Sequence, residues 1–197
     1  MNRRSPLFLI ALIALPGLAS AQAAAPAASP NPMGPPIAGI CLFGRDAAVA
    51  NSKAGQATNA RLTQLGQQVN VELAPESQAI VTENNALNAS ATTIPAAQRN
   101  ARIEALQKRA ATFNQLQQQR TAQLQTTRGL AIEQILKQMD PVLGPTSTSR
   151  HCSIVFERSA SYGFNPAMDI TPAVIQQLDT RLPTLTFNLA PPESVKR

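Results

Sequence analysis

The middle of the chain is a long polar stretch in which apolar residues recur at helical spacing. Residues 53–140 contain few glycines and are rich in Gln, Ala, Leu and Arg, a composition typical of long helices. The Ser/Thr cluster and Pro95 of "ASATTIPAAQR" interrupt this stretch, and such a cluster ends one helix and begins the next. We therefore predict a helical hairpin over residues 53–140, with arms about 55 and 65 Å long at about 1.5 Å per residue.

The apolar positions of the two predicted arms fit a single antiparallel register. Facing residues in an antiparallel hairpin have a constant sum of residue numbers. Three apolar pairs share the sum 186: Leu62 with Leu124, Leu73 with Phe113, and Ile80 with Leu106. Polar residues lie between these layers, so the coiled-coil seam is weak and easily bent. Pro75 removes one backbone hydrogen bond from the outgoing arm, and we expect a kink there rather than the end of the helix.

Short apolar runs on either side of the hairpin predict strands. "IAGICLF", residues 37–43, is a continuous apolar run that Gly44 ends, the pattern of a strand buried on both faces. After Pro141 and the loop "GPTSTSR", the segment "CSIVFERSASYGF" predicts two strands, residues 153–157 and 161–164, with a turn near residues 158–160. We expect these three strands to belong to one small head.

A short amphipathic helix is predicted near the C-terminus, in "NPAMDITPAVIQQLDTRL". Thr171 can cap a helix whose first residue is Pro172, where the missing N–H costs nothing. Ile175, Leu178 and Leu182 then share one face, which needs a sheet or another helix to cover it. The remaining "PTLTFNLAPPESVKR" is interpreted as a loose tail.

Together these elements predict an α+β fold, mostly α, with a small β-rich head interrupted by a long antiparallel helical hairpin. The head comprises residues 37–52 and 141–185, the hairpin arm comprises residues 53–140, and residues 186–197 form a flexible tail. A three-stranded head with one short helix cannot cover its own sheet and edges, which favours oligomerisation through the head.

The N-terminus has the pattern of a secretory signal peptide over residues 1–21. Arg3 and Arg4 precede an apolar run over residues 7–15, and "ASA" at residues 19–21 is a small-x-small cleavage site. The alternative, a membrane anchor, is disfavoured because the run is too short to cross about 30 Å of hydrocarbon. Residues 22–36 offer almost nothing to bury, which predicts a disordered leader. We expect an exported, soluble mature chain.

Composition narrows the function classes. Without residues 1–21 the chain has 15 Lys and Arg (17 less two) against 11 Asp and Glu, so its net charge is +4. The full chain contains no Trp and only 4% aromatic residues, which argues against nucleic-acid platforms that stack bases on aromatic rings.

The two cysteines, Cys41 and Cys152, favour a disulfide over a metal site, because they are even in number in an exported chain. They come together if the hairpin leaves from and returns to one sheet. In the entropic model, a bridge that closes a loop of about 110 residues stabilises the fold by roughly 4 to 5 kcal/mol. The alternative is two buried thiols.

No catalytic, cofactor or metal motif is recognisable. There is no P-loop, no dinucleotide-binding glycine pattern and no His/Cys/Asp cluster at metal-ligand spacing. His151, the only histidine, lies in a Ser/Thr-rich loop, so we interpret it as a solvated residue rather than a member of a catalytic triad. We therefore expect no enzyme activity, no cofactor and no metal.

One charged cluster is the candidate binding site. Within residues 98–109, Arg99, Arg102, Lys108 and Arg109 stand against Glu104 alone, four basic residues against one acidic, for a net charge of +3 near the far end of the hairpin. Such a run is usually a solvated helix face. The functional alternative is an electrostatic attraction for acidic partners.

Four parts of the chain resemble the Skp (OmpH) family of periplasmic chaperones. They are the opening strand "IAGICLF", the helix entry "VANSKAGQATNARLTQL", the helical hairpin, and the ending "YGFNPAMDITPAVIQQLD". The resemblance covers about residues 37–182, and only the terminal strand and the "DIT" helix start are specific to it. The hairpin departs from the family pattern because it is richer in Gln, poorer in Lys and interrupted by Pro75.

The resemblance implies a jellyfish-like trimer, in which three heads form a β-rich core and three hairpins enclose a cavity for unfolded outer-membrane proteins. It implies an ATP-independent periplasmic holdase that does not span the membrane, and it leaves open peripheral contact with a membrane surface. We expect the arms to hold clients, with Arg99, Arg102, Lys108 and Arg109 as candidate residues. No lipopolysaccharide-binding residues can be matched. The alternative is a structural or adaptor coiled coil of the cell envelope that binds a folded partner.

Overall fold

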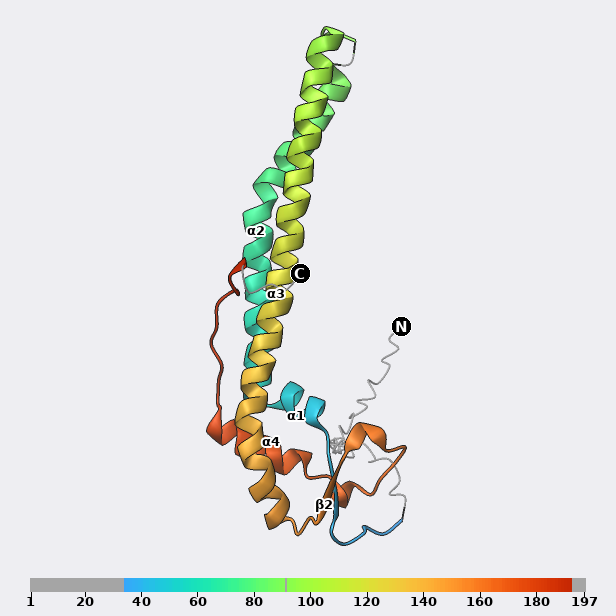
Figure 1. The fold of residues 1–197 in the computed structure, drawn as a ribbon, viewed down its shortest axis with the longest axis vertical. Coiled ribbons are helices and arrows are strands. Elements are labelled where there is room, and N and C mark those ends of the chain that lie inside the picture. The colour runs from blue at the N-terminus through green and yellow to red at the C-terminus, as the bar shows by residue number, and fades with distance from the viewer. Residues whose placement is uncertain (1–33, 91, 193–197) are drawn as a thin grey trace, which may run out of the picture. The chain divides into compact units, whose positions relative to one another are not determined.

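A long helical hairpin dominates the part of the chain that the computed structural model describes, residues 34–90 and 92–192. Helices α2 (Lys53–Ala89) and α3 (Ala96–Ser149) lie side by side and run antiparallel (Figure 1). The predicted fold class, mostly α with a small β-containing head, is confirmed. The predicted signal peptide, residues 1–21, and most of the predicted leader lie outside the described residues.

The hairpin begins at a tight junction between α1 (Arg45–Asn51) and α2. Ser52 is fully buried there, and its hydroxyl caps α2 by accepting a hydrogen bond from the Gly55 N–H at 3.1 Å. Gly55 allows the two helices to approach closely, because a Cβ at this position would lie 1.8 Å from the Val49 carbonyl oxygen. Beyond this junction α2 continues through Pro75 without ending.

Helix α3 is longer than the sequence predicts, because it continues through Pro141 and Pro145 to Ser149. The predicted loop "GPTSTSR" is therefore wrong. Packing accounts for the difference: Val142 and Leu143 lie against the core, and this burial offsets the cost of about 3 kcal/mol for a proline inside a helix. Hydroxyl groups near the helix end also donate to carbonyl oxygens one turn earlier, as Thr146 does to Val142 at 2.7 Å.

The head contains two parallel strands, β1 (Ile40–Phe43) and β2 (Ile154–Glu157), paired from Ile40 with Ile154 to Phe43 with Glu157. Parallel pairing needs a crossover, and the hairpin supplies it. The predicted third strand at residues 161–164 is wrong. A short 3-10 turn, Arg158–Ala160, follows β2 instead, and β1 receives its other contact from the chain just before the last helix, where the Ile170 N–H donates to the Leu42 carbonyl at 2.9 Å.

Helix α4 (Thr171–Arg181) forms the core with β1 and the lower part of α3. Its Val174 and Leu178 are fully buried and belong to the same cluster as Ile135 and Met139 of α3. The amphipathic helix near the C-terminus therefore has a clear structural role. Its apolar face covers the base of the hairpin and β1, the strand that precedes the hairpin.

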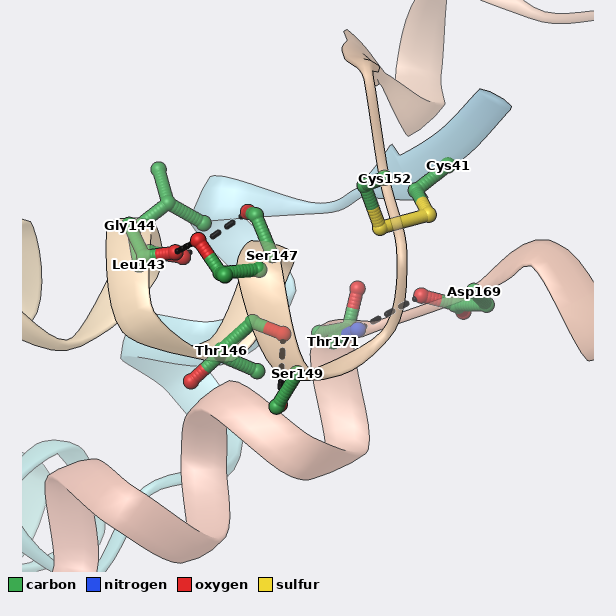
Figure 2. Close-up of a disulfide and its surroundings, with 10 residues drawn as sticks. Cys41, Leu143, Gly144, Thr146, Ser147, Ser149, Cys152, Asp169 and Thr171 are labelled. Atoms are coloured by element: carbon green, nitrogen blue, oxygen red, sulfur yellow. Dashed lines mark hydrogen bonds between the residues drawn. A yellow bond between two sulfur atoms is a disulfide. The ribbon is translucent and has the colours of Figure 1, made fainter. Parts of the chain in front are cut away.

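Thr171 does not cap α4 as predicted, because it lies inside the helix. The Asp169 carboxylate accepts a hydrogen bond from the Thr171 N–H at 2.8 Å, as Figure 2 shows. The Thr171 hydroxyl is therefore available for a buried contact, and it accepts a hydrogen bond from the Gly44 N–H at 2.8 Å. This contact holds the start of α4 against the end of β1.

A disulfide joins Cys41 of β1 to Cys152, just before β2 (Figure 2). The two Cα atoms are 5.6 Å apart, and the bond spans a sequence separation of 111 residues. The cross-link therefore closes the head at the point where the hairpin leaves it and returns to it.

The segment after α4 differs from the predicted loose tail. It runs along the hairpin (Figure 1) and ends its described part against α3, where Ala190 is 5% exposed. Residues 186–190 therefore lie against the helices, and residues 193–197 lie outside the described part of the chain.

Candidate functional site

The hairpin has a packed lower half and a sparsely packed upper half. On α3, every buried side chain among the described residues lies between Gln123 and Thr146, and none lies in the first half of the helix. On α2, Leu65, Val69 and Leu73 are buried below Pro75, whereas only Leu87 is buried above it. Since buried apolar contacts are the main source of helix-pair stability, the upper half is the part of the hairpin that can separate or bend.

Three ion pairs connect the arms across their exposed edges. Arg102 contacts Glu83 at 2.8 Å, Arg109 forms two hydrogen bonds with Glu76, and Arg120 contacts Glu72 at 2.6 Å. The residue numbers of the first two pairs each add up to 185, one less than the sum of 186 that the apolar pairs predict. The antiparallel register inferred from the sequence therefore agrees with these two pairs to within one residue, whereas the numbers of Arg120 and Glu72 add up to 192 and depart from it by six.

Hydrogen bonds within these pairs shift the ionisation of their members. The Arg109 guanidinium lowers the pKa of the Glu76 carboxyl below its ordinary value, chiefly through hydrogen bonding. Arg120 lowers the pKa of Glu72 in the same way. Both carboxylates therefore stay charged at lower pH than an isolated glutamate, although their exposure to solvent weakens the pairs and makes them sensitive to salt.

These pairs change the interpretation of the predicted basic cluster. Arg102 and Arg109 face carboxylates of α2, Lys108 is exposed, and Arg99 is partly buried with its Nε atom lacking a hydrogen-bond partner. Over residues 76–109 of both arms, four basic residues stand against three acidic ones, so the net charge is +1 rather than the +3 of α3 alone.

The acidic partners were missed because they are distant in sequence, 33 residues away in the case of Arg109 and Glu76. The constant-sum register already contains the signal that could have found them. Applied to charged residues, it brings Glu83 close to Arg102 and Glu76 close to Arg109.

The head exposes an apolar strand. The β2 side chains Ile154, Val155 and Phe156 are 51%, 36% and 51% exposed, and Tyr162 nearby is fully exposed. The sheet of the described residues has two strands only, so β2 also presents an unpaired backbone edge. An exposed apolar strand with a free edge is a surface that favours pairing with another chain. We call Ile154, Val155, Phe156 and Tyr162 the β2 patch.

The described residues contain no group of three or more His, Cys, Asp or Glu side chains that could hold a metal ion. None of the helices in this part of the chain is long and apolar enough to span a membrane. His151 is exposed at the end of α3, where its positive φ of 57° turns the chain toward β2.

The chain matches the family model for outer membrane protein (OmpH-like) over residues 39–178. It is also similar to a crystal structure from Caulobacter crescentus CB15 that is described as an OmpH-like outer membrane chaperone, with 35% sequence identity and a TM-score of 0.71. The similarity covers 79% of this chain and 92% of that one. A comparison with curated proteins gives no match.

Proposed function

Because the chain belongs to the OmpH-like family, we propose that it is an ATP-independent holdase chaperone of the periplasm that binds unfolded outer-membrane proteins and prevents their aggregation. The observation that carries the proposal is the contrast within the hairpin. Its lower half is fixed to the head by a buried core, whereas the first half of α3 has no buried side chain. Such an arm can bend around clients of different size at little energetic cost.

We propose that three copies assemble through the head, with residues 37–52 and 141–185 as the oligomerisation part and three hairpins around a cavity. The β2 patch supports this arrangement, since one copy leaves an apolar strand and its edge uncovered. A mass measurement in solution tests the assembly, and a monomer at micromolar concentration would contradict it.

The test of the function is the dilution of a urea-unfolded outer-membrane β-barrel protein into buffer with and without this chain, in the absence of ATP. We expect light scattering to be suppressed at about equimolar chaperone trimer. The alternative, a structural or adaptor coiled coil that binds a folded partner, predicts no suppression.

The arms contribute to capture through charge as well as shape in this proposal. Replacing Arg99, Arg102, Lys108 and Arg109 with Gln should slow the capture of acidic clients, and added salt should slow the wild-type protein more than the variant. Lys108→Gln alone is the sharper variant, because Lys108 is exposed and its removal leaves the ion pairs to Glu76 and Glu83 intact. Equal capture rates for the wild type and the variants at low salt would show that the four basic residues are only a solvated helix face.

A further inference from the structure

The segment after α4 has the shape and pattern of an extended strand, although it pairs with no sheet. Leu185, Phe187 and Leu189 are half-buried, and they alternate with the exposed residues Thr184, Thr186 and Asn188. This period of two is the pattern of a strand with one covered face. The covering surface is not a sheet but the lower half of the α2–α3 hairpin (Figure 1). We call residues 184–190 the docked segment.

The hairpin's hydrogen bonds to the docked segment go mainly to its backbone, while the three apolar side chains face the covered side. Gln123 donates to the Ala190 carbonyl at 2.6 Å, and the Thr127 hydroxyl accepts from the Ala190 N–H at 2.8 Å. On the other arm, Arg61 donates to the Phe187 carbonyl at 3.0 Å, with one longer bond of 3.3 Å to the Asn188 side chain. Every chain offers these backbone groups, so three of the four contacts do not depend on the sequence of the bound segment.

The residues that make these contacts are positioned in advance. Gln123 and Thr127 are each 3% exposed. The Thr127 hydroxyl donates to the Gln123 carbonyl at 2.6 Å, and the Gln123 side-chain oxygen accepts from Arg120 at 2.8 Å. Buried polar side chains of this kind need partners, and the backbone of the docked segment supplies them. An open cavity of about 600 Å³ lies beside the segment, lined by Ala57, Ala60, Arg61 and Gln64.

We call the surface of α2 and α3 under the docked segment the groove. We propose that the groove is a binding site for an extended client segment with apolar residues at alternate positions, and that the docked segment occupies it when no client is bound. The inference rests on the proposed function and deepens it. Alternating apolar residues are the pattern of β-strands, including strands that face lipid on one side. The docked segment competes at the high effective concentration of a tethered ligand, so a client must displace it.

The experiment uses the full chain and a fluorescent peptide with the sequence of residues 183–192, PTLTFNLAPP. Three proteins are compared by fluorescence anisotropy. They are the wild type, a release variant with Leu185→Ser, Phe187→Ser and Leu189→Ser, and the release variant with Gln123→Ala and Thr127→Val added. We expect the release variant to bind the peptide at least about 10-fold more tightly than the wild type, because its own segment no longer competes. Adding the two groove substitutions should abolish this gain.

Matched controls lie on the same helix. Gln119→Ala and Thr121→Val change exposed residues of α3, and Thr121 makes the same hydroxyl contact to a carbonyl one turn earlier as Thr127 does. Added to the release variant, they should leave peptide binding unchanged. A permuted peptide in which the three large apolar residues are consecutive should bind at least about 10-fold more weakly, because they cannot all face the groove.

A second variant keeps the test independent of the serine substitutions. Ala190→Pro removes the N–H that donates to Thr127, whereas Ala190→Gly keeps it. The proline variant should bind the peptide more tightly than the glycine variant. Far-ultraviolet circular dichroism should give the same helix content for all proteins.

Two results would overturn the inference. One is equal peptide binding by the wild type, the release variant and the Ala190→Pro variant. The other is full peptide binding by the release variant that also carries Gln123→Ala and Thr127→Val. The aggregation assay separates this inference from the proposed function. If aggregation is suppressed but the peptide does not bind, the groove proposal is rejected and the holdase proposal stands. Peptide binding without any suppression rejects the holdase and leaves a groove for extended peptides.

Discussion

At the scale of single residues, a few positions decide how the hairpin is attached to the head. Ser52 caps α2, the Asp169 carboxylate accepts a hydrogen bond from the Thr171 N–H at the start of α4, and the Thr171 hydroxyl connects α4 to the end of β1. Gly55 permits the close contact between the end of α1 and the start of α2. The three polar groups each accept a hydrogen bond from a backbone N–H, and Gly55 meets a steric limit that a Cβ would violate.

Gly55→Ala should destabilise the fold, because the new Cβ would lie 1.8 Å from the Val49 carbonyl oxygen. We expect the free energy of unfolding to fall by about 3 kcal/mol or more, the upper range for overpacking in a tight core. Urea denaturation followed by circular dichroism measures the change. Gly66→Ala is the matched control, since nothing lies within 4 Å of its Cβ position, and it should stabilise α2 by about 0.5 to 1 kcal/mol.

Glu76→Gln should lower the melting temperature slightly at neutral pH, because it removes the partner of Arg109. Hydrogen bonding to Arg109 lowers the folded-state pKa of Glu76 below 4.5. The pair therefore stabilises the fold above pH 4.5, and this contribution disappears as the pH falls through the lowered value. Melting curves of the wild type and the variant should converge in acid. Glu104→Gln changes an exposed residue of α3 outside the three pairs, and as the matched control it should leave the melting temperature at neutral pH unchanged.

At the scale of elements, the two halves of α3 differ in how many of their side chains are buried. Its C-terminal half, from Gln123 to Thr146, carries all the buried side chains of the helix and contacts α2, α4 and the docked segment. Its N-terminal half is held by exposed ion pairs and partly buried apolar residues. We therefore expect the same element to anchor the fold at one end and to open locally at the other.

Amide hydrogen exchange should reveal this division. Residues 123–139 should exchange slowly, near the rate of global unfolding, whereas residues 97–118 should exchange at least about 10-fold faster through local opening. Mass spectrometry of peptic fragments gives the comparison. Uniform protection along α3 would contradict a movable upper half.

At the scale of the whole molecule, the head of one copy leaves an apolar surface exposed. Two strands form its sheet in the described residues, and the β2 patch is left uncovered. The proposed trimer would cover this surface, and the disulfide would hold both strands in the geometry that the assembly needs.

Phe156→Asp should dissociate the proposed trimer, because a charge buried in an apolar interface is costly. Light scattering after size-exclusion chromatography should then give the mass of a monomer with an unchanged helix content. Val81→Asp introduces the same charge at a position of α2 with similar exposure, 49% against 51%, and should leave the assembly intact. A trimer that survives Phe156→Asp would move the interface away from β2.

Replacing Cys41 and Cys152 with serine should lower the free energy of unfolding by about 2 to 5 kcal/mol, since the cross-link closes a long loop. Thermal or urea denaturation checks the value. Mass spectrometry of the alkylated, non-reduced protein checks the bond itself, and two alkylated cysteines in the exported form would show that it does not form in the cell.

Local patterns could not predict contacts made between distant segments. The +3 charge of residues 98–109 was correct as a count, but Glu76 and Glu83 belong to the other helix and neutralise half of the cluster. The docked segment pairs with no strand in the described residues, and from sequence it was interpreted as a loose tail. Its alternation of apolar and polar residues was visible, but the surface that it covers exists only after α2 and α3 have packed.

The sequence by itself determined the hairpin, the antiparallel register of its upper half, the first strand and the closing helix, because local periodicity and simple chain geometry specify these features. It favoured the pairing of Cys41 with Cys152 over two buried thiols. Only the tertiary structure decided that α3 passes through Pro141 and Pro145, that Thr171 lies inside α4 and bonds to the end of β1, and that residues 186–190 dock on the hairpin. In each case a contact between segments far apart in sequence outweighs the local preference. Such contacts depend on the packed surface as a whole, and no short stretch of sequence contains it.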